Sequence, residues 1–214
     1  MTHGRTGSET RARAPRSSSR ELLEDAAFEL FLENTYAKTT IEQITQRAGV
    51  GRSTFFNYFQ GKSDVFWVDV DGAVQQLSDA LADQAPDARP LPAMGAALAS
   101  VTREFGPSRV PWILTQYALI GSAPEVQASA LARFSQWAGI LATFAGVRLG
   151  LDPASTLPRT IAYSLTGALV AAAQEWAAAG TARGSLEPYV TAATAPLLTA
   201  FAPRSALHPA APSL

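Results

Sequence analysis

Cysteine is absent from this chain of 214 residues, histidine occurs twice, and charged residues make up only 16% of the sequence. Without cysteine the chain can form no disulfide, no thiolate nucleophile and no cysteine-ligated zinc site. His3 and His208 lie in stretches rich in Pro, Ala, Ser and Gly, where a catalytic base or a metal ligand would be poorly held. We therefore expect no enzyme, no catalytic residues, no bound metal and no cofactor.

Long apolar runs are also lacking. The most apolar stretch, residues 161–180, is interrupted by Gln174 and Glu175, and falls short of the ~18 uncharged apolar residues that a membrane span requires. Residues 1–20 contain five Arg and one Glu and lack the apolar segment of a secretory signal. These absences lead us to expect a cytoplasmic protein that has no membrane partner.

Apolar residues are plentiful, at 47% of the chain. A charged fraction below the usual ~25% leaves material for a large core, so we expect one large domain or two small ones. The net charge of −1 divides unevenly, because residues 1–62 hold nine Lys and Arg against seven Asp and Glu, whereas residues 63–214 hold eight against eleven. Such asymmetry can mark an end that binds a polyanion.

The spacing of the apolar residues predicts an all-α chain, because it is helical nearly throughout and no stretch alternates as a strand would. Ser18, with Glu21 three residues later, has the capping-box spacing and should begin a helix that ends near Asn34. A second capping box is possible at Thr39 or Thr40, where the side chain of Glu42 or Gln43 would bond back to the backbone of the capping residue. It would begin a short helix that Gly49 closes. Later breaks carry Pro and mostly Gly. The further helices that we predict are 52–58, a long helix capped by Ser63, 92–105, 111–120, 124–149, 158–179 and 186–202, about nine in all.

Residues 40–59, TIEQITQRAGVGRSTFFNYF, predict a helix-turn-helix, with two short helices joined by a turn that contains glycine. Ala48 supplies a small residue at the crossing, Gly49 a left-handed bend and Val50 an apolar plug. Phe55 and Phe59 lie four residues apart and should point inward. Their positions turn a cation, hydroxyls, an amide and aromatic edges outward, groups that suit the phosphates and base edges of a DNA major groove.

Residues 20–67 as a whole resemble the N-terminal domain of TetR-type (tetracycline-repressor-like) transcriptional regulators. The matching elements are AFELF at 27–31, Tyr36 with Thr39 and Thr40, ITQRAGV at 44–50, GRSTFFNYF at 51–59 and Lys62. Three positions depart from the family pattern: Gly51 replaces the usual Ser, Thr45 the usual Ala and Phe56 the usual Tyr. The last change removes a hydroxyl, so we expect Phe56 to make an apolar base contact rather than a bond to phosphate.

The resemblance implies a repressor that binds a roughly palindromic double-stranded operator as a homodimer and is released by a small effector. It implies DNA contacts at eight positions: Thr40, Arg52, Ser53, Thr54, Phe56, Asn57, Tyr58 and Lys62. The dimer would form through the helices 158–179 and 186–202, which are poor in charge. Those two helices could equally form a buried core within one chain.

The resemblance also implies a site for the effector in the C-terminal domain. Eight residues are candidates for an apolar pocket oriented by a few polar groups, namely Trp67, Trp112, Gln116, Tyr117, Phe134, Trp137, Tyr163 and Thr166. Packing in an ordinary core is the alternative for each aromatic residue. Only nine charged residues lie between Arg103 and Gly180, which favours a mainly apolar effector.

The predicted domains are a disordered Arg-rich tail at 1–17, the helix-turn-helix domain at 18–62, a ligand-binding and dimerisation domain at 63–202 and a disordered tail at 203–214. The first tail could be a solvated leader or an arm along the DNA backbone. Two other functions stay open. One is an all-helical enzyme or small-molecule carrier, and the other is a ligand-binding or protein-interaction protein that has lost operator binding.

Overall fold

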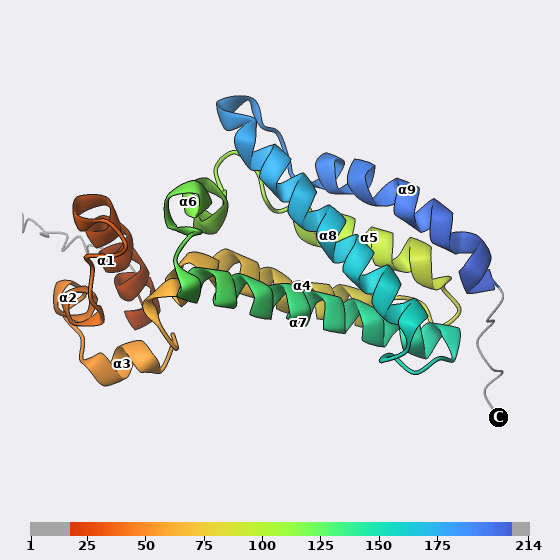
Figure 1. Cartoon of the computed structure of the whole chain (residues 1–214), viewed down its shortest axis with the longest axis horizontal. Coiled ribbons are helices and arrows are strands. Elements are labelled where there is room, and N and C mark those ends of the chain that lie inside the picture. The colour runs from red at the N-terminus through yellow and green to blue at the C-terminus, as the bar shows by residue number, and fades with distance from the viewer. Residues whose placement is uncertain (1–17, 207–214) are drawn as a thin grey trace, which may run out of the picture. The chain divides into compact units, whose positions relative to one another are not determined.

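The computed structural model describes residues 18–206, which form helices and no strands (Figure 1). The α-helices are α1 Ser19–Asn34, α2 Ile41–Arg47, α3 Arg52–Phe56, α4 Val68–Ala82, α5 Pro90–Thr102, α6 Trp112–Ile120, α7 Pro124–Leu149, α8 Thr156–Ala178 and α9 Glu187–Ala206. Two 3₁₀ helices, η1 Lys62–Trp67 and η2 Gly180–Ala182, accompany them. The prediction of an all-α chain with about nine helices is confirmed over this range.

The chain divides into two compact units between Lys62 and Ser63. The predicted tail at 1–17 and residues 207–214 of the second tail lie outside the described residues. That second tail was expected to begin at residue 203, but α9 continues to Ala206. Pro196 and Pro203 therefore both lie within α9, and neither of them ends the helix.

Capping residues begin the first two helices of unit 1. The Ser18 hydroxyl accepts a hydrogen bond from the Glu21 amide at 3.2 Å, and the Glu21 carboxylate accepts one from the Ser18 amide at 2.8 Å. Thr40 and Gln43 form the same reciprocal pair at the start of α2, which decides between the alternatives that the sequence left open. Thr39 is buried instead, and its hydroxyl donates to the carbonyls of Leu30 and Thr35.

The start of unit 2 differs from the prediction. Ser63 was expected to cap a long α-helix, but it is buried within η1, and α4 begins only at Val68 without a side-chain cap. Contacts from α7 account for the tighter turn: the Arg133 guanidinium lies 3.2 Å from an Asp64 carboxylate oxygen and 5.0 Å from the centre of the Trp67 ring. Short 3₁₀ segments of this kind are common at helix termini.

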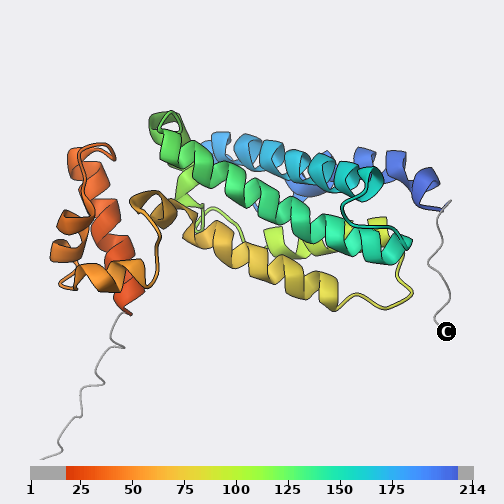
Figure 2. The ribbon, with the colours of Figure 1, turned by 60° about the horizontal axis from the view of Figure 1, so that its bottom comes forward.

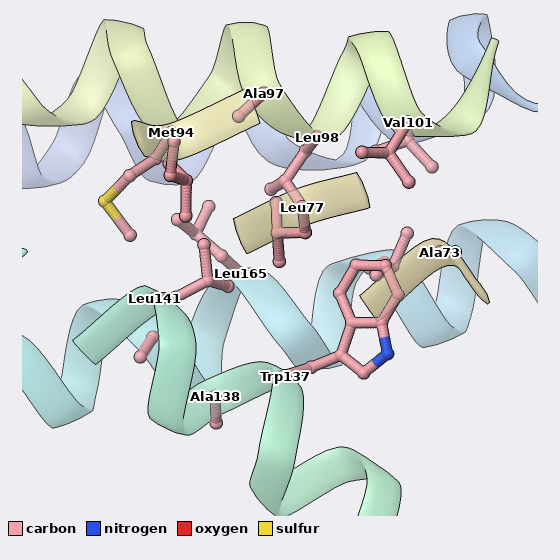
Figure 3. Close-up of a cluster of buried hydrophobic side chains, with 14 of the residues drawn as sticks. Ala73, Leu77, Met94, Ala97, Leu98, Val101, Trp137, Ala138, Leu141 and Leu165 are labelled. Atoms are coloured by element: carbon pink, nitrogen blue, oxygen red, sulfur yellow. The ribbon is translucent and has the colours of Figure 1, made fainter. Parts of the chain in front are cut away.

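A single apolar core holds unit 2 together. Helix α7 packs against α8, α5 packs against α9, and α8 packs against α9, while α4 contacts α5 and α7 (Figures 1 and 2). Side chains from α4, α5, α7 and α8 converge in this core, among them Leu77, Leu98, Leu141 and Leu165, all fully buried (Figure 3). The burial of so many Leu and Ala side chains provides the main stabilisation of this unit.

Candidate nucleic-acid interface

A left-handed glycine sets the turn between α2 and α3. Gly49 has φ +68°, a backbone conformation that L-residues other than Asn and Asp rarely adopt, and its amide donates to the Gln46 carbonyl at 3.2 Å. The Val50 amide then donates to the Thr45 carbonyl at 3.0 Å. Gly51 is extended, and α3 begins at the next residue. The predicted helix-turn-helix is therefore present, with the bend at the glycine expected to make it.

Two buried phenylalanines, Phe55 on α3 and Phe59 just after it, orient the segment that contains α3. Phe55 and Phe59 are buried, and their ring centres lie 5.3 Å apart. Ile44 and Phe31 are also buried in the core of unit 1. Because these rings point inward, the intervening side chains must point outward. Helix α3 ends at Phe56, two residues earlier than predicted, and Asn57 is its C-cap.

The outward side chains form what we call the recognition face: Arg52, Ser53, Thr54, Phe56, Asn57 and Tyr58. Phe56 is 47% exposed and Tyr58 is 48% exposed, so both rings can be reached from solvent. Arg52, Ser53 and Asn57 are also exposed, and Thr54 is half-buried. Six of the eight predicted DNA contacts thus lie on one short segment of unit 1. Thr40 is exposed at the start of α2.

Lys62 has a structural role that the sequence did not indicate. Its Nζ donates to the carbonyls of Tyr36 at 2.7 Å and Thr39 at 3.0 Å, and it lies 4.2 Å from the centre of the Tyr36 ring. These contacts tie the end of unit 1 to the loop between α1 and α2. Its predicted contact with a phosphate stays a prediction.

Ion pairs bring in two residues, Glu42 and Arg47, that the sequence did not indicate as part of this surface. Arg52 pairs with Glu42 of α2, and its guanidinium lies 5.4 Å from the centre of the Phe56 ring. Glu42 and Arg52 are ten positions apart across the turn, so no helical spacing connects them. Arg47 at the end of α2 pairs with Glu29 at 2.9 Å and Glu33 at 2.8 Å. The spacing of Glu29 and Glu33, four residues apart on α1, could have indicated a shared cation.

The Arg47 contacts change the acidity of the groups involved. The hydrogen bond from Arg47 lowers the pKa of Glu33, and the two carboxylates raise the pKa of Arg47. All three side chains are largely exposed, so the pairs hold α1 and α2 together only weakly.

Comparison with protein families decides what this fold belongs to. A family model described as bacterial regulatory proteins, tetR family, matches residues 23–66, and a C-terminal model described as the MftR C-terminal domain matches residues 88–202, more than half of the chain. The chain belongs to the tetR family. The resemblance that the helix-turn-helix residues carried is confirmed, and it extends over both units.

Relatives of this tetR-family chain are transcriptional regulators. It is 26% identical over 168 residues to a Mycobacterium tuberculosis protein named as the mycofactocin biosynthesis transcriptional regulator MftR, a match that covers 78% of this chain and 84% of the relative. It is 28% identical over 139 residues to the HTH-type transcriptional regulator TcmR of Streptomyces glaucescens, covering 63% and 62%. The matched families and relatives are regulators, as expected of a chain that is not an enzyme.

Solved structures of regulators share the fold. SmeT, the repressor of the Stenotrophomonas maltophilia efflux pump SmeDEF, aligns with a TM-score of 0.56 at 23% identity, covering 86% of this chain and 90% of SmeT. The fatty acid degradation regulator FadR of Bacillus halodurans aligns with a TM-score of 0.58 at 18% identity, covering 86% and 96%. At these identities the likeness establishes the fold.

The predicted effector residues of this tetR-family chain do not gather in one described cavity. Trp137 and Thr166 are buried in the core, whereas Tyr117 and Tyr163 are exposed and Gln116 is half-buried. Two aromatic pairs form instead: Trp112 stacks on Phe66 with ring centres 4.8 Å apart, and Phe134 lies 6.1 Å from Tyr163. The effector set stays a prediction.

A groove of about 620 Å³ runs between α4 and α7, lined by other residues: Ser78, Leu81, Ala82, Gln136, Gly139, Ile140, Thr143, Phe144, Val147 and Arg148. Trp67 packs under Arg133, and its buried indole N–H has no hydrogen-bond acceptor among the described residues.

Within residues 18–206 no group of His, Cys, Asp and Glu could hold a metal ion. None of the helices in the same range is long and apolar enough to cross a membrane.

Proposed function

We propose that this tetR-family regulator is a repressor that binds a roughly palindromic operator as a homodimer and is released by a small, mainly apolar effector. The observation that carries the proposal is the recognition face, whose exposed side chains follow a left-handed glycine and are turned outward by the buried Phe55 and Phe59. We expect such a regulator to act in the cytoplasm, where the bacterial chromosome lies.

The recognition face offers a group for each kind of DNA contact. The guanidinium of Arg52 can bond the O6 and N7 atoms of guanine or a phosphate, and the Asn57 amide can bond adenine. Hydroxyls of Thr40, Ser53, Thr54 and Tyr58 suit phosphates, and the Phe56 ring suits a thymine methyl group. Lys62 would add a phosphate contact at the edge of the face.

Helices α8 and α9 offer an uncharged surface for a second copy of the chain. No charged residue occurs in residues 160–174 or 188–202. Their exposed side chains are mostly small or apolar: Thr160, Tyr163, Gly167, Val170, Ala171 and Gln174 on α8, and Thr191, Ala192, Ala195, Pro196, Thr199 and Ala200 on α9. We call this set the α8–α9 face. Small side chains allow helices of two chains to approach closely, and depletion of charge is typical of an interface core.

Release by an effector requires a difference in affinity. A ligand can shift the DNA-bound state only if it binds more tightly to a conformation in which the two recognition faces no longer match successive major grooves. The scarcity of charge in residues 103–180 favours a mainly apolar ligand.

The test is a binding titration with the DNA that flanks the protein's own gene, at two salt concentrations, with an unrelated duplex as competitor. We expect preferred binding to the flanking DNA that weakens steeply with salt, because phosphate contacts release counterions. Arg52→Ala and Asn57→Ala should weaken binding or relax its sequence preference, and Lys38→Ala, on an exposed side chain outside the recognition face, should change it little. Absence of any salt-dependent, sequence-preferring binding would contradict the proposal.

A further inference from the structure

Arg52 is held from two sides on the surface of unit 1. Its Nη1 pairs with the Glu42 carboxylate, which extends from the first turn of α2, and its guanidinium stacks 5.4 Å from the centre of the Phe56 ring. The side chains of Arg52 and Glu42 are 58% and 61% exposed, so DNA can reach both. The exposed ion pair is weak, but together with the contact to the ring it favours one orientation of the guanidinium, and only part of its five-donor fork faces the carboxylate.

The carboxylate changes what Arg52 can recognise. Because Glu42 offsets the charge of the guanidinium, the pair attracts a phosphate anion less strongly than an unpaired Arg would. A guanine edge carries no net charge, and its O6 and N7 atoms still accept hydrogen bonds from the guanidinium N–H groups. The orientation that the carboxylate and the ring favour also lowers, by a small amount, the side-chain entropy that Arg52 loses on docking.

The other ion pairs described in unit 1 involve cations outside the recognition face. Glu29 and Glu33 pair with Arg47, which lies at the end of α2 and outside the recognition face. Glu24 pairs with Arg20 within α1. Glu42 is thus the acidic residue, among those with described ion pairs in unit 1, that contacts a side chain of the recognition face.

From this geometry we infer that Glu42 is a positioning residue: it directs Arg52 to a guanine in the major groove and away from the phosphate backbone. The inference rests on the function proposed above, and it concerns selectivity. Glu42 lowers the affinity of the protein for DNA in general and raises the ratio of specific to non-specific binding.

Glu42→Gln tests this inference, with Asp25→Asn as a control that removes one negative charge from an exposed side chain of α1. Dissociation constants are measured for the duplex that the wild-type protein selects from a random pool and for an unrelated duplex of equal length. We expect Glu42→Gln to bind the unrelated duplex about threefold to tenfold more tightly, with a salt slope steeper by about 0.9, because Arg52 gains a phosphate. The specific to non-specific ratio should fall about fivefold or more. Asp25→Asn should leave the ratio and the slope unchanged.

A second comparison asks whether Glu42 acts through Arg52. In an Arg52→Ala background, Glu42→Gln should change neither the ratio nor the slope, and Glu42→Asp should retain most of the wild-type ratio. Replacing the guanines of the selected duplex with 7-deazaguanine, which lacks the N7 acceptor, should weaken wild-type binding more than binding by Glu42→Gln. Thermal melts of each variant confirm that the compared proteins are folded.

Two results separate this inference from the proposed function. If the wild-type protein and Arg52→Ala differ in selectivity but Glu42→Gln matches the wild type, the inference is wrong and the proposed function stands. If Glu42→Gln lowers the ratio equally with and without Arg52, Glu42 does not act through that residue. A wild-type protein that shows no sequence preference overturns the proposed function, and this inference with it.

Discussion

At the scale of single residues, Lys62 combines a predicted role in DNA binding with an observed role in the fold of unit 1. The sequence places it beside the recognition face, where a cation suits a phosphate, yet its ammonium group bonds the carbonyls of Tyr36 and Thr39 and stacks on the Tyr36 ring. Hydrogen bonds from a charged donor are stronger than neutral ones, and a half-buried carbonyl that loses its donor costs free energy. A role in DNA binding must therefore be measured separately from a role in folding.

Lys62→Met separates the two roles. We expect the variant to lower the free energy of unfolding by about 2 kcal/mol, because two charge-assisted bonds are lost from a partly buried site. The measurement is a urea titration of the full chain followed by circular dichroism. Lys38→Met, on an exposed lysine in the same loop region, serves as the control and should change stability by less than about 0.5 kcal/mol. Equal stabilities for the two variants would contradict the structural role of Lys62.

The pairs of Arg47 predict a dependence of stability on pH. Arg47 holds the pKa of Glu33 below its ordinary value of 4.5. Glu33 therefore binds its proton less readily in the folded chain, and the contact stabilises the fold at pH values above about 4.5 and is lost as the pH falls below that value. Melting temperatures of the wild type and Glu33→Gln should differ at pH 7 and converge as the pH is lowered through the reduced pKa of Glu33, below 4.5. The difference should be small because both partners are exposed.

Asp25→Asn on the same helix controls for removal of a charge in general. If the gap between the wild type and Glu33→Gln does not narrow as the pH falls below 4.5, the ion pair does not cause it.

At the scale of elements, local signals predicted some helix ends well and others poorly. Helix α7 begins and ends where predicted, because Pro124 suits a first helical position and Gly150, with φ +65°, closes the helix. The predicted start of α4 at Ser63 was wrong. Contacts from Arg133, which is distant in sequence, hold residues 62–67 in the tighter turn of η1. No pattern near Ser63 carries that information.

The turn between α2 and α3 depends on the positive φ of Gly49. A Cβ at this position would meet nothing within 4 Å, so substitution acts through the positive φ and not through a steric clash. Gly49→Val should lower the free energy of unfolding by about 1–2 kcal/mol, because a β-branched residue is strained in the left-handed region. Gly49→Asn, which tolerates that region, should cost clearly less. Chemical denaturation of both variants is the measurement, and equal losses would contradict the backbone explanation.

At the scale of the whole molecule, the recognition face was predictable and the effector residues were not. Burial of Phe55 and Phe59, four residues apart, determines which neighbouring side chains face outward, so a local pattern was sufficient. Trp137 and Tyr163 both stand on helices with apolar stripes, yet one is buried and the other exposed, because their surroundings depend on which helices pack together. That packing is not encoded at any fixed spacing.

The α8–α9 face predicts the assembly of the protein. Val170 is 42% exposed on this face, and a charge buried there in a dimer would be unpaired. Val170→Glu should shift the protein from dimer to monomer at micromolar concentration in sedimentation velocity, and DNA affinity should fall with it. Val147→Glu, on an even more exposed residue of α7, should leave the dimer intact. A dimer that survives Val170→Glu and dissociates with Val147→Glu would place the interface elsewhere.

If two copies of the recognition face bind DNA together, the full-length protein should select a characteristic kind of duplex from a random pool. We predict that the enriched sequences are inverted repeats whose half-site centres lie about one helical turn, 34–36 Å, or a multiple of it apart. We also predict that Asn57→Ala loses preference at one position in each half-site. Enrichment of a single, unrepeated site, or no enrichment at all at moderate salt, would contradict the account.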